Sequence, residues 1–597
     1  MPLIAFFFVA VLSSLQSIHP LTSILGQYGR WEGLLTISCY LILYLTAHKL
    51  AERKELLNSL HLSLLASSLT ISTIAIIEHF WTNPFLLFAK TYCPVEFSQP
   101  NAYDTSRSIA TFGNATFLAA YLAIVLPIIF SYSMFMGKTA RLRVLSYLSL
   151  FFTLISLLLT LGRAAWLGAF AGIVLILWLS WSRAKRFYKH ATAVAIIFAL
   201  AFAIMSMAGY AHPLKDRFAS IFKVEGSTLT RIQIWRSSLP LISENPLLGS
   251  GPDTFKYVFG KYKPEGWVQH LSDPQIDRAH SDILQTTITQ GILGLLVYLW
   301  LSILIFWLGI KKAKPWKNSD EFWIVAGMLG SAFAYITQLQ FNFSHFSTAP
   351  LFWIILGIVT RLLFTSSNSK IIATGISRRQ RPAAIALISI MIVVLATWSI
   401  LPLEADIHFE RGRSLEAKGK LKDAITEYTL ATTINGYEPI YKVSLAKALI
   451  QSGIKTKNKE SIDLGSQVFS QAKQLNPFDE HIYFSEGDAY LNAGRSGWPS
   501  FFEKSIESLY RGLELNPVMV DAYIDIGIAY AYLRNYDEAI NAWNDALAIE
   551  PNNDKVYFNL GWVYEQKGEQ KLAKKAYLKA FRLNPQMIEA RVASDRL

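Results

Sequence analysis

The sequence predicts an all-α protein, a polytopic membrane helix bundle followed by an α-solenoid of short helical repeats. Apolar runs that can cross a bilayer, each about 17–25 residues long, recur over the first 400 residues. The charge balance changes near residue 403, because 404–597 holds 24 Lys+Arg against 27 Asp+Glu, whereas 32 basic and 16 acidic residues precede it. Beyond that point similar residues recur every 34 positions. We therefore predict a membrane domain at 1–403 and a water-exposed domain at 404–597.

The excess of positive charge belongs to the apolar part, which carries +16 against −3 for the remainder. Basic residues beside hydrophobic spans usually set membrane topology, so we expect no nucleic-acid partner. The two cysteines, Cys39 and Cys93, have neither disulfide-framework nor metal-site spacing. His270, Asp273 and Asp277 are more simply interpreted as solvated loop residues than as metal ligands.

Eleven apolar runs are predicted to span the membrane. They lie near 1–16, 33–47, 60–78, 115–136, 145–162, 163–182, 191–210, 283–310, 321–342, 350–365 and 383–402. The first run lacks the basic start and the cleavage site of a signal peptide, so we predict a retained helix. The run at 283–310 is unusual because ionisable and amide side chains crowd its entry, and plain apolar sequence begins only at Gly291.

The loops between these runs alternate in charge. The segments 48–57, 137–143, 183–190, 311–321 and 361–381 contain 19 of the 32 basic residues and four acidic ones, whereas the other set holds 13 basic against 12 acidic. The positive-inside rule makes the first set cytoplasmic, and the assignment alternates without a violation. It predicts a cytoplasmic N-terminus, an extracytoplasmic loop at 211–282 and an extracytoplasmic region after 403.

The region after 403 resembles an array of tetratricopeptide repeats. The stretch that begins at Tyr523 is followed 34 residues later by a similar one at Tyr557, and an earlier unit is stretched to 40. Small residues recur where two helices cross and a proline ends each unit, as in this repeat family. The pairs in register are Gly527 and Gly561, Ala539 and Ala573, Ala546 and Ala580, and Pro551 and Pro585. Such arrays bind peptides or proteins, although packing on the membrane domain alone is also open.

Charged residues of the extracytoplasmic set stand out next to the apolar runs. Arg163 lies between two runs, Arg231 and Arg236 lie in the large loop, and Arg278 and His280 precede the run at 283–310. Ionisable groups at such positions are costly and mark functional sites more often than other surface charges. All five are predicted to lie at one face of the membrane.

Four motifs occur in order: TFGNATFLAAYLAIVLP at 111–127, LGRAAWLGAF at 161–170, RIQIWRSSLPLISENPLLGSGPDTF at 231–255 and AHSDILQTTITQGILGLLVYL at 279–299. Together they resemble the bacterial O-antigen ligase and polymerase superfamily of polytopic GT-C-type glycosyltransferases. The resemblance covers about 105–365, and repeats after the last span also occur in relatives of this family.

The resemblance implies a reaction on the outer face of the plasma membrane. A glycan on a polyprenyl diphosphate lipid, usually undecaprenyl, would move to an acceptor hydroxyl of a lipid, protein or surface glycan, without an essential metal or other cofactor. The family's motif arginines correspond to Arg163 and Arg231, and its histidine before the next helix corresponds to His280. Ser281 stands where relatives often have asparagine, which leaves the role of that position open.

The chemistry explains these residue types. Guanidinium groups bind diphosphate oxygens bidentately, and an imidazole with a pKa of about 6.5 is suited to take the acceptor's proton. We therefore predict that Arg163 and Arg231 hold the diphosphate and that His280 is the base or positions the acceptor. Arg236, Arg278 and Asn114 are predicted as further substrate contacts.

Each residue also has a structural interpretation. Arg163 would anchor a helix at the headgroups, His280 would be a polar helix-start residue, and Asn114 would cap the helix that begins at 115. Salt bridges in a loop of mixed charge would explain the remaining arginines, which are Arg231, Arg236 and Arg278.

Three classes of function remain distinct. A glycan ligase is favoured, and a polymerase of the same family shares its fold and arginines. A non-enzymatic assembly factor would use the repeats to gather envelope proteins, but an anchor needs one span. A transporter of lipid-linked glycans would carry ionisable residues near the middle of several spans, whereas those found here gather at one face.

Overall fold

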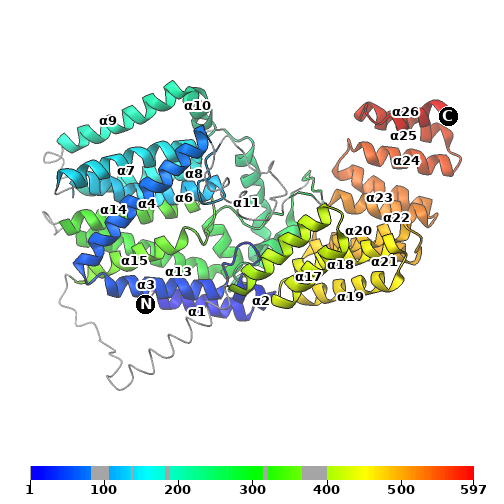
Figure 1. The fold of residues 1–597 in the computed structure, drawn as a ribbon, viewed down its shortest axis with the longest axis horizontal. Helices are drawn as coiled ribbons and strands as arrows, with labels where there is room; N and C mark the ends of the chain where they lie inside the picture. Colours follow the sequence, from blue (N-terminus) through cyan, green and yellow to red (C-terminus); the bar gives the residue numbers. More distant parts are fainter. Residues whose placement is uncertain are drawn as a thin grey trace, which may run out of the picture. The chain divides into compact units, whose positions relative to one another are not determined.

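The computed structural model describes residues 2–81, 107–135, 139–181, 188–221, 223–264, 266–270, 272–273, 275–313, 320–365 and 400–597, which are mostly helical (Figure 1). The chain divides into two compact units. The membrane unit consists of 1–255 and 278–373, and the repeat unit consists of 256–277 and 374–597. The segment 256–277 thus groups with the repeats and not with the helices before and after it. The boundary at 403 stays a prediction.

The membrane unit is a bundle of apolar helices. Seven helical segments are long and apolar enough to cross a membrane, and three more are shorter apolar helices, among the residues that the structure describes. The chain is therefore a multi-pass membrane protein. The predicted run 383–402 lies almost wholly outside the described residues, so eleven spans stay a prediction. The helices are α1 (Pro2–Leu15), α3 (Leu34–Leu50), α4 (Lys54–Phe80), α6 (Ala115–Phe135), α7 (Ala140–Leu159), α8 (Arg163–Ser180), α9 (Tyr188–Met205), α13 (Asp282–Ala313), α14 (Asp320–Leu339) and α15 (Ala349–Thr365).

Shorter elements connect these helices. A π-helical turn at Ser206–Tyr210 joins α9 to the next helix, and Gly209 inside it has a φ of 87°. The connecting helices are α2 (Pro20–Leu25), α10 (Ala211–Ala219), α11 (Ser227–Glu244) and α12 (Phe255–Phe259). Three of them, α10, α11 and α12, belong to the large loop between α9 and α13.

Helix α14 packs against both α8 and α6 in the centre of the membrane unit. Two glycines of α8 allow the close approach, because a Cβ at Gly168 or at Gly172 would lie 2.4 Å from the carbonyl oxygen of Ala334 or Gly330 on α14. Small residues let helix backbones come together in a membrane. This packing fixes the start of α8, where Arg163 is the first residue.

Helix α13 is broken at Gly291, where φ is 68° and ψ is −171°. A side chain there would collide with the backbone of Leu247, because a Cβ on Gly291 would lie 2.2 Å from the Leu247 carbonyl. Carbonyls of the preceding loop accept hydrogen bonds from the amides after the break, at 2.8 Å from Ile292 to Pro246. The polar entry of the predicted run 283–310 is therefore a separate helical segment, and the apolar segment starts after Gly291.

The repeat unit contains pairs of adjacent helices, which confirms the predicted α-solenoid. The pairs α18 with α19, α20 with α21, α22 with α23 and α24 with α25 pack closely. A helix over 400–417 precedes them. The remaining bounds are α17 (Leu421–Ile434), α18 (Pro439–Thr456), α19 (Lys459–Leu475), α20 (Glu480–Arg495), α21 (Ser500–Leu515), α22 (Val520–Tyr532), α23 (Tyr536–Ile549), α24 (Asp554–Gln566), α25 (Gln570–Leu583) and α26 (Ile588–Arg596).

The recurrent glycines lie where the two helices of a pair cross. A Cβ at Gly527 would lie 2.2 Å from the indole nitrogen of Trp543, and one at Gly561 would lie 2.6 Å from the ring of Tyr577. Both aromatic side chains are almost fully buried. The 34-residue period therefore repeats one contact, a glycine under a large ring.

The segment 256–277 binds the turns between successive repeats. Lys256 forms an ion pair of 3.0 Å with Asp479, and burial of the amine is outweighed by this carboxylate, which raises the pKa of Lys256. The backbone of Gln269 pairs with the chain around Met519 in a parallel bridge. Further along, His270 lies 3.2 Å from Asp521. Charge and backbone pairing together hold this segment on the repeats.

We expect Gly527→Val to destabilise the repeat unit, because the added side chain overlaps the indole of Trp543. Overpacking of this kind costs about 1–3 kcal/mol. Thermal unfolding of the full-length protein in detergent, followed by circular dichroism, measures the effect. The matched control is Gly436→Ala, whose Cβ would meet only one carbonyl oxygen, at 3.4 Å. Equal unfolding midpoints for the two variants would contradict the assignment of Gly527 to the crossing point.

Candidate functional site

Four arginines line one cavity of the membrane unit, here called the arginine cavity. Its volume is about 170 Å³, and no aspartate or glutamate is among the described residues that line it. Its walls come from the segment before α6 and the start of α6, the turn between α7 and α8 and the start of α8, the helices α10 and α11, and the residues after α14. The lining residues are Arg107, Thr116, Ala119, Gly162, Arg163, Ala164, Ala165, Arg217, Ser227, Arg231 and Asn342.

The turn between α7 and α8 positions three of these arginines. Leu161 has a φ of 51°, which reverses the chain before Arg163 opens α8. Carbonyl oxygens of this turn accept hydrogen bonds from two guanidinium Nε groups, at 2.7 Å from Arg107 to Thr160 and at 2.9 Å from Arg217 to Leu161. The C-terminal end of a helix carries partial negative charge, which favours cations there.

Arg163 is held from the other side by the loop between α10 and α11. Its terminal nitrogens donate to the carbonyl oxygen of Ser220 and to the hydroxyl of Ser227, both at 2.6 Å. These contacts fix the plane of the guanidinium group. A planar group with fixed orientation suits bidentate recognition of a phosphate.

The charges of the arginine cavity repel one another. Burial is the main reason that the pKa of Arg231 falls to about 10, and Arg163 and Arg217 lower it further. Gathering like charges in a partly buried cavity costs free energy unless an anion binds there. Perturbed groups that meet in a cavity mark candidate functional sites. The arginine cavity therefore has the chemistry of a polyanion site.

The structure brings Arg163 and Arg231 together, and it adds two arginines that the sequence reasoning missed. Arg107 and Arg217 lie in connecting segments with ordinary mixed charge, and neither stands in a recognised motif. The only signal in the sequence was their place in the extracytoplasmic set of loops. The fold of such loops decides which of their basic residues come together in one cavity.

His280 lies beside the arginine cavity but does not line it. It has a φ of 53°, and its ring meets that of Phe343 edge-on, with centroids 5.2 Å apart. The residue before Phe343, Asn342, lines the arginine cavity. Trp235 of α11 holds the backbone next to the histidine, because its indole nitrogen donates to the carbonyl of Ala279 at 2.9 Å.

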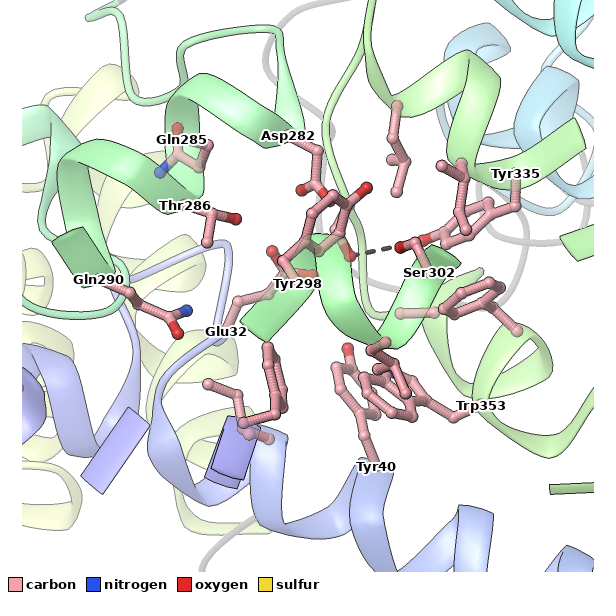
Figure 2. Close-up of a pocket in the computed structure, with 18 of the residues that line it drawn as sticks. Glu32, Tyr40, Asp282, Gln285, Thr286, Gln290, Tyr298, Ser302, Tyr335 and Trp353 are labelled. Atoms are coloured by element: carbon pink, nitrogen blue, oxygen red, sulfur yellow. Dashed lines mark hydrogen bonds between the residues drawn. The ribbon is translucent and has the colours of Figure 1, made fainter. Parts of the chain in front are cut away.

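Arg278 lies in a second cavity, here called the acidic cavity, which has a volume of about 150 Å³. Its guanidinium group pairs with Asp253 at 2.6 Å and with Glu32 at 3.4 Å. Figure 2 shows Glu32 and Asp282 with amide side chains of α13 on one side and aromatic rings on the other. Polar lining residues are Glu32, Tyr40, Asp253, Arg278, Asp282, Gln285, Thr286, Thr289, Gln290, Tyr298, Ser302, Tyr335 and Ser344.

Two further predicted substrate contacts lie outside both cavities. Arg236 is exposed on α11. Asn114 is exposed at the start of α6, and its side-chain oxygen accepts a hydrogen bond of 2.7 Å from the amide of Thr116. The expected capping of α6 is thus present, and Thr116 itself lines the arginine cavity. Substrate contacts of Arg236, Arg278 and Asn114 stay predictions.

Comparisons with known proteins match both units. The O-antigen ligase family model matches residues 148–299, a range that includes three arginines of the arginine cavity and His280. Two tetratricopeptide repeat models match 532–568 and 554–587. A human relative, Protein O-mannosyl-transferase TMTC3, is 23% identical over 186 residues, which cover 30% of this chain and 20% of that protein. The match thus spans about a fifth of that relative's length.

Solved structures also match part of the chain. The crystal structure of MamA protein is 22% identical, covering 31% of this chain and 94% of its own, with a TM-score of 0.26. TTC0263, a thermophilic repeat protein of Thermus thermophilus, is 21% identical, covering 32% and 97%, with a TM-score of 0.26. YrrB, a repeat protein described as having an unusual peptide-binding site, is 16% identical, covering 32% and 92%, with a TM-score of 0.26.

We expect Glu32 to make the stability of the membrane unit depend on pH. Burial raises the pKa of Glu32 to about 7 from 4.5, although Arg278 opposes the shift. Between these two values the folded chain holds a proton that the unfolded chain releases, so stability falls as the pH rises through this window. Glu32→Gln removes this contribution, and its unfolding midpoint should change less between about pH 5 and about pH 8 than that of the native protein. Thermal unfolding in detergent at the two pH values measures these midpoints. The same change of midpoint with pH in the native protein and in Glu32→Gln would refute the expectation.

Proposed function

We propose that this chain, which carries an O-antigen ligase domain and C-terminal tetratricopeptide repeats, is a membrane glycosyltransferase. It transfers a glycan from a polyprenyl diphosphate lipid to an acceptor hydroxyl of a lipid, a protein or a surface glycan. The observation that carries the proposal is the arginine cavity, where four guanidinium groups meet and none of the described lining residues is a carboxylate. The human relative is named for O-mannosyl transfer, which is of the same general class.

The arginine cavity supplies what a diphosphate leaving group needs. As the bond between the sugar's anomeric carbon and the diphosphate oxygen breaks, negative charge gathers on the diphosphate. Arg163 and Arg231, joined by Arg107 and Arg217, neutralise that charge and bind its oxygens. Preorganised donors of this kind contribute several kcal/mol each, about 100-fold in rate per group.

His280 supplies the proton acceptor. The acceptor hydroxyl attacks the anomeric carbon and transfers its proton to the imidazole as the new carbon–oxygen bond forms. Phe343 supports the ring of His280 edge-on, and Asn342 beside it lines the arginine cavity. The proposed base, His280, is therefore connected to the arginine cavity through the consecutive residues Asn342 and Phe343.

The proposed reaction takes place on the outer face of the plasma membrane. The assignment of this side rests on the charge of the loops, because all four arginines of the arginine cavity belong to the extracytoplasmic set. The repeats, which suit protein or peptide partners, would lie on the same side. We propose that they recruit the acceptor or a partner of the envelope assembly.

The activity is tested with purified full-length protein in liposomes and an undecaprenyl diphosphate-linked glycan from the native host. Arg163→Ala, Arg231→Ala and His280→Ala should each lower the release of undecaprenyl diphosphate by about 100-fold. The matched control is Lys215→Ala, which removes an exposed cation of α10 outside the cavity. The mass of the glycan product distinguishes ligation from polymerisation. Full activity in His280→Ala would end the role of this histidine as a base.

Arg217 provides a separate test of the cavity, because it was found from the structure alone. Arg217→Ala should weaken binding of undecaprenyl diphosphate by about tenfold, the loss of one charged hydrogen-bonding group, and Arg217→Lys should restore part of it. Microscale thermophoresis of the detergent-solubilised protein measures the affinity. Unchanged affinity in Arg217→Ala would remove this residue from the site.

A further inference from the structure

The acidic cavity contains polar atoms that no group of the described residues satisfies. The hydroxyl of Tyr40, one oxygen of Glu32, the amide oxygen of Gln290 and the amide nitrogen of Gln285 are buried without a hydrogen-bond partner in the described part of the chain. Tyr40 and Gln290 are 8% and 9% exposed. An unsatisfied buried polar group costs about 1–3 kcal/mol. Four of them around one cavity indicate that a polar ligand completes the set.

The chemistry of the acidic cavity suits a neutral polyhydroxylated ligand. Arg278 is already paired with Asp253, so the cavity offers little net positive charge to an anion. Amide and tyrosine side chains offer both donors and acceptors, as the hydroxyl groups of a sugar require. The rings of Tyr40 and Trp353 stack with centroids 6.2 Å apart and form an aromatic wall, which Figure 2 shows opposite the amides of α13.

The acidic cavity adjoins the proposed base. Arg278 and Asp282 line it, and His280 lies between them in the chain with a left-handed backbone. On the facing segment, Asn342 lines the arginine cavity and Ser344 lines the acidic cavity. The residue between these two, Phe343, carries the ring that contacts His280. The histidine therefore lies at the partition between an anion site and a hydroxyl-binding site.

We propose that the acidic cavity is a binding subsite for one sugar ring, placed so that a hydroxyl of that sugar reaches His280. This assignment rests on the proposed glycosyl transfer, because the position beside His280 gains its meaning from that reaction. The ring belongs either to the acceptor glycan or to the donor glycan, and the two sources share the same chemistry. The amides of α13 bind its hydroxyl groups, and the aromatic wall packs against its apolar face.

Binding is tested with methyl α-D-glucopyranoside, methyl α-D-mannopyranoside and N-acetyl-D-glucosamine. Isothermal titration calorimetry on the full-length protein in detergent should detect at least one of the three. Gln290→Leu and Tyr40→Phe should each weaken that binding by about tenfold, the loss of one hydrogen-bonding group. Failure of all three sugars to bind, or an affinity unchanged from the native protein in both variants, would overturn the subsite.

Tyr40→Phe separates binding from folding. Its hydroxyl has no partner among the described residues, so its removal should leave the unfolding midpoint unchanged or higher while sugar binding falls. The matched control for the sugar is Arg217→Ala in the arginine cavity, which should keep the sugar affinity within twofold. A sugar affinity that falls equally in Arg217→Ala and Tyr40→Phe would place the ring outside the acidic cavity and overturn the assignment.

Two readouts keep this subsite distinct from the proposed function. Undecaprenyl diphosphate that binds through Arg217, while no sugar binds, would overturn the subsite and leave the function standing. A sugar that binds through Gln290, in a protein that neither binds undecaprenyl diphosphate nor transfers glycan, would overturn the function and leave a sugar site. In the active protein, Gln290→Leu raises KM for the acceptor if the ring is the acceptor's, and KM for the donor glycan if it is the donor's.

Discussion

The buried ion pair between Asp253 and Arg278 is the contact on which the site depends. One carboxylate oxygen of Asp253 binds the guanidinium group at 2.6 Å, and the other accepts the backbone amides of Gln27 at 2.7 Å and Glu32 at 3.0 Å. Three segments that are distant in the sequence are thus tied at one side chain. A buried pair adds little net stability, since desolvation offsets the attraction. The ion pair instead fixes the position of the backbone near His280, because Arg278 is two residues from that histidine.

The same loop also determines how α13 enters the membrane unit. The amides of Ser250 and Gly251 donate to the carbonyls of Ile288 and Thr289, both at 2.9 Å, on the segment before the break at Gly291. A helix interrupted in hydrocarbon leaves backbone groups that need partners inside the protein. The loop supplies those partners, so the break is tolerated and the polar segment can line the acidic cavity. The polar side chains at the start of the predicted run 283–310 are therefore explained by the acidic cavity that they line, and not by an extension of the membrane span.

The sequence predicted the architecture well and the site in part. Spans follow from the length of apolar runs and repeats follow from local periodicity, and neither needs knowledge of the fold. The pairing of Arg163 with Arg231 came from motifs. Arg217 was missed because a single arginine in a mixed-charge loop carries no sign of where the loop folds. Arg278 was expected as a further substrate contact, and its carboxylate partner Asp253 was not foreseen, since that contact joins separate parts of the large loop.

The two cavities have opposite chemistry, which has a physical reason in the proposed transfer between two polar substrates. A diphosphate site needs an excess of positive charge, whereas a hydroxyl site works best with charges already neutralised, as Arg278 is by Asp253. If these groups shared one cavity, the carboxylates would pair with the arginines and weaken both functions. The ring of Phe343, which also takes the guanidinium of Arg30 over its face at 4.6 Å from the centroid, belongs to the short segment between them. An apolar partition of this kind keeps the carboxylates and the arginines from direct contact and leaves His280 beside each of the two cavities.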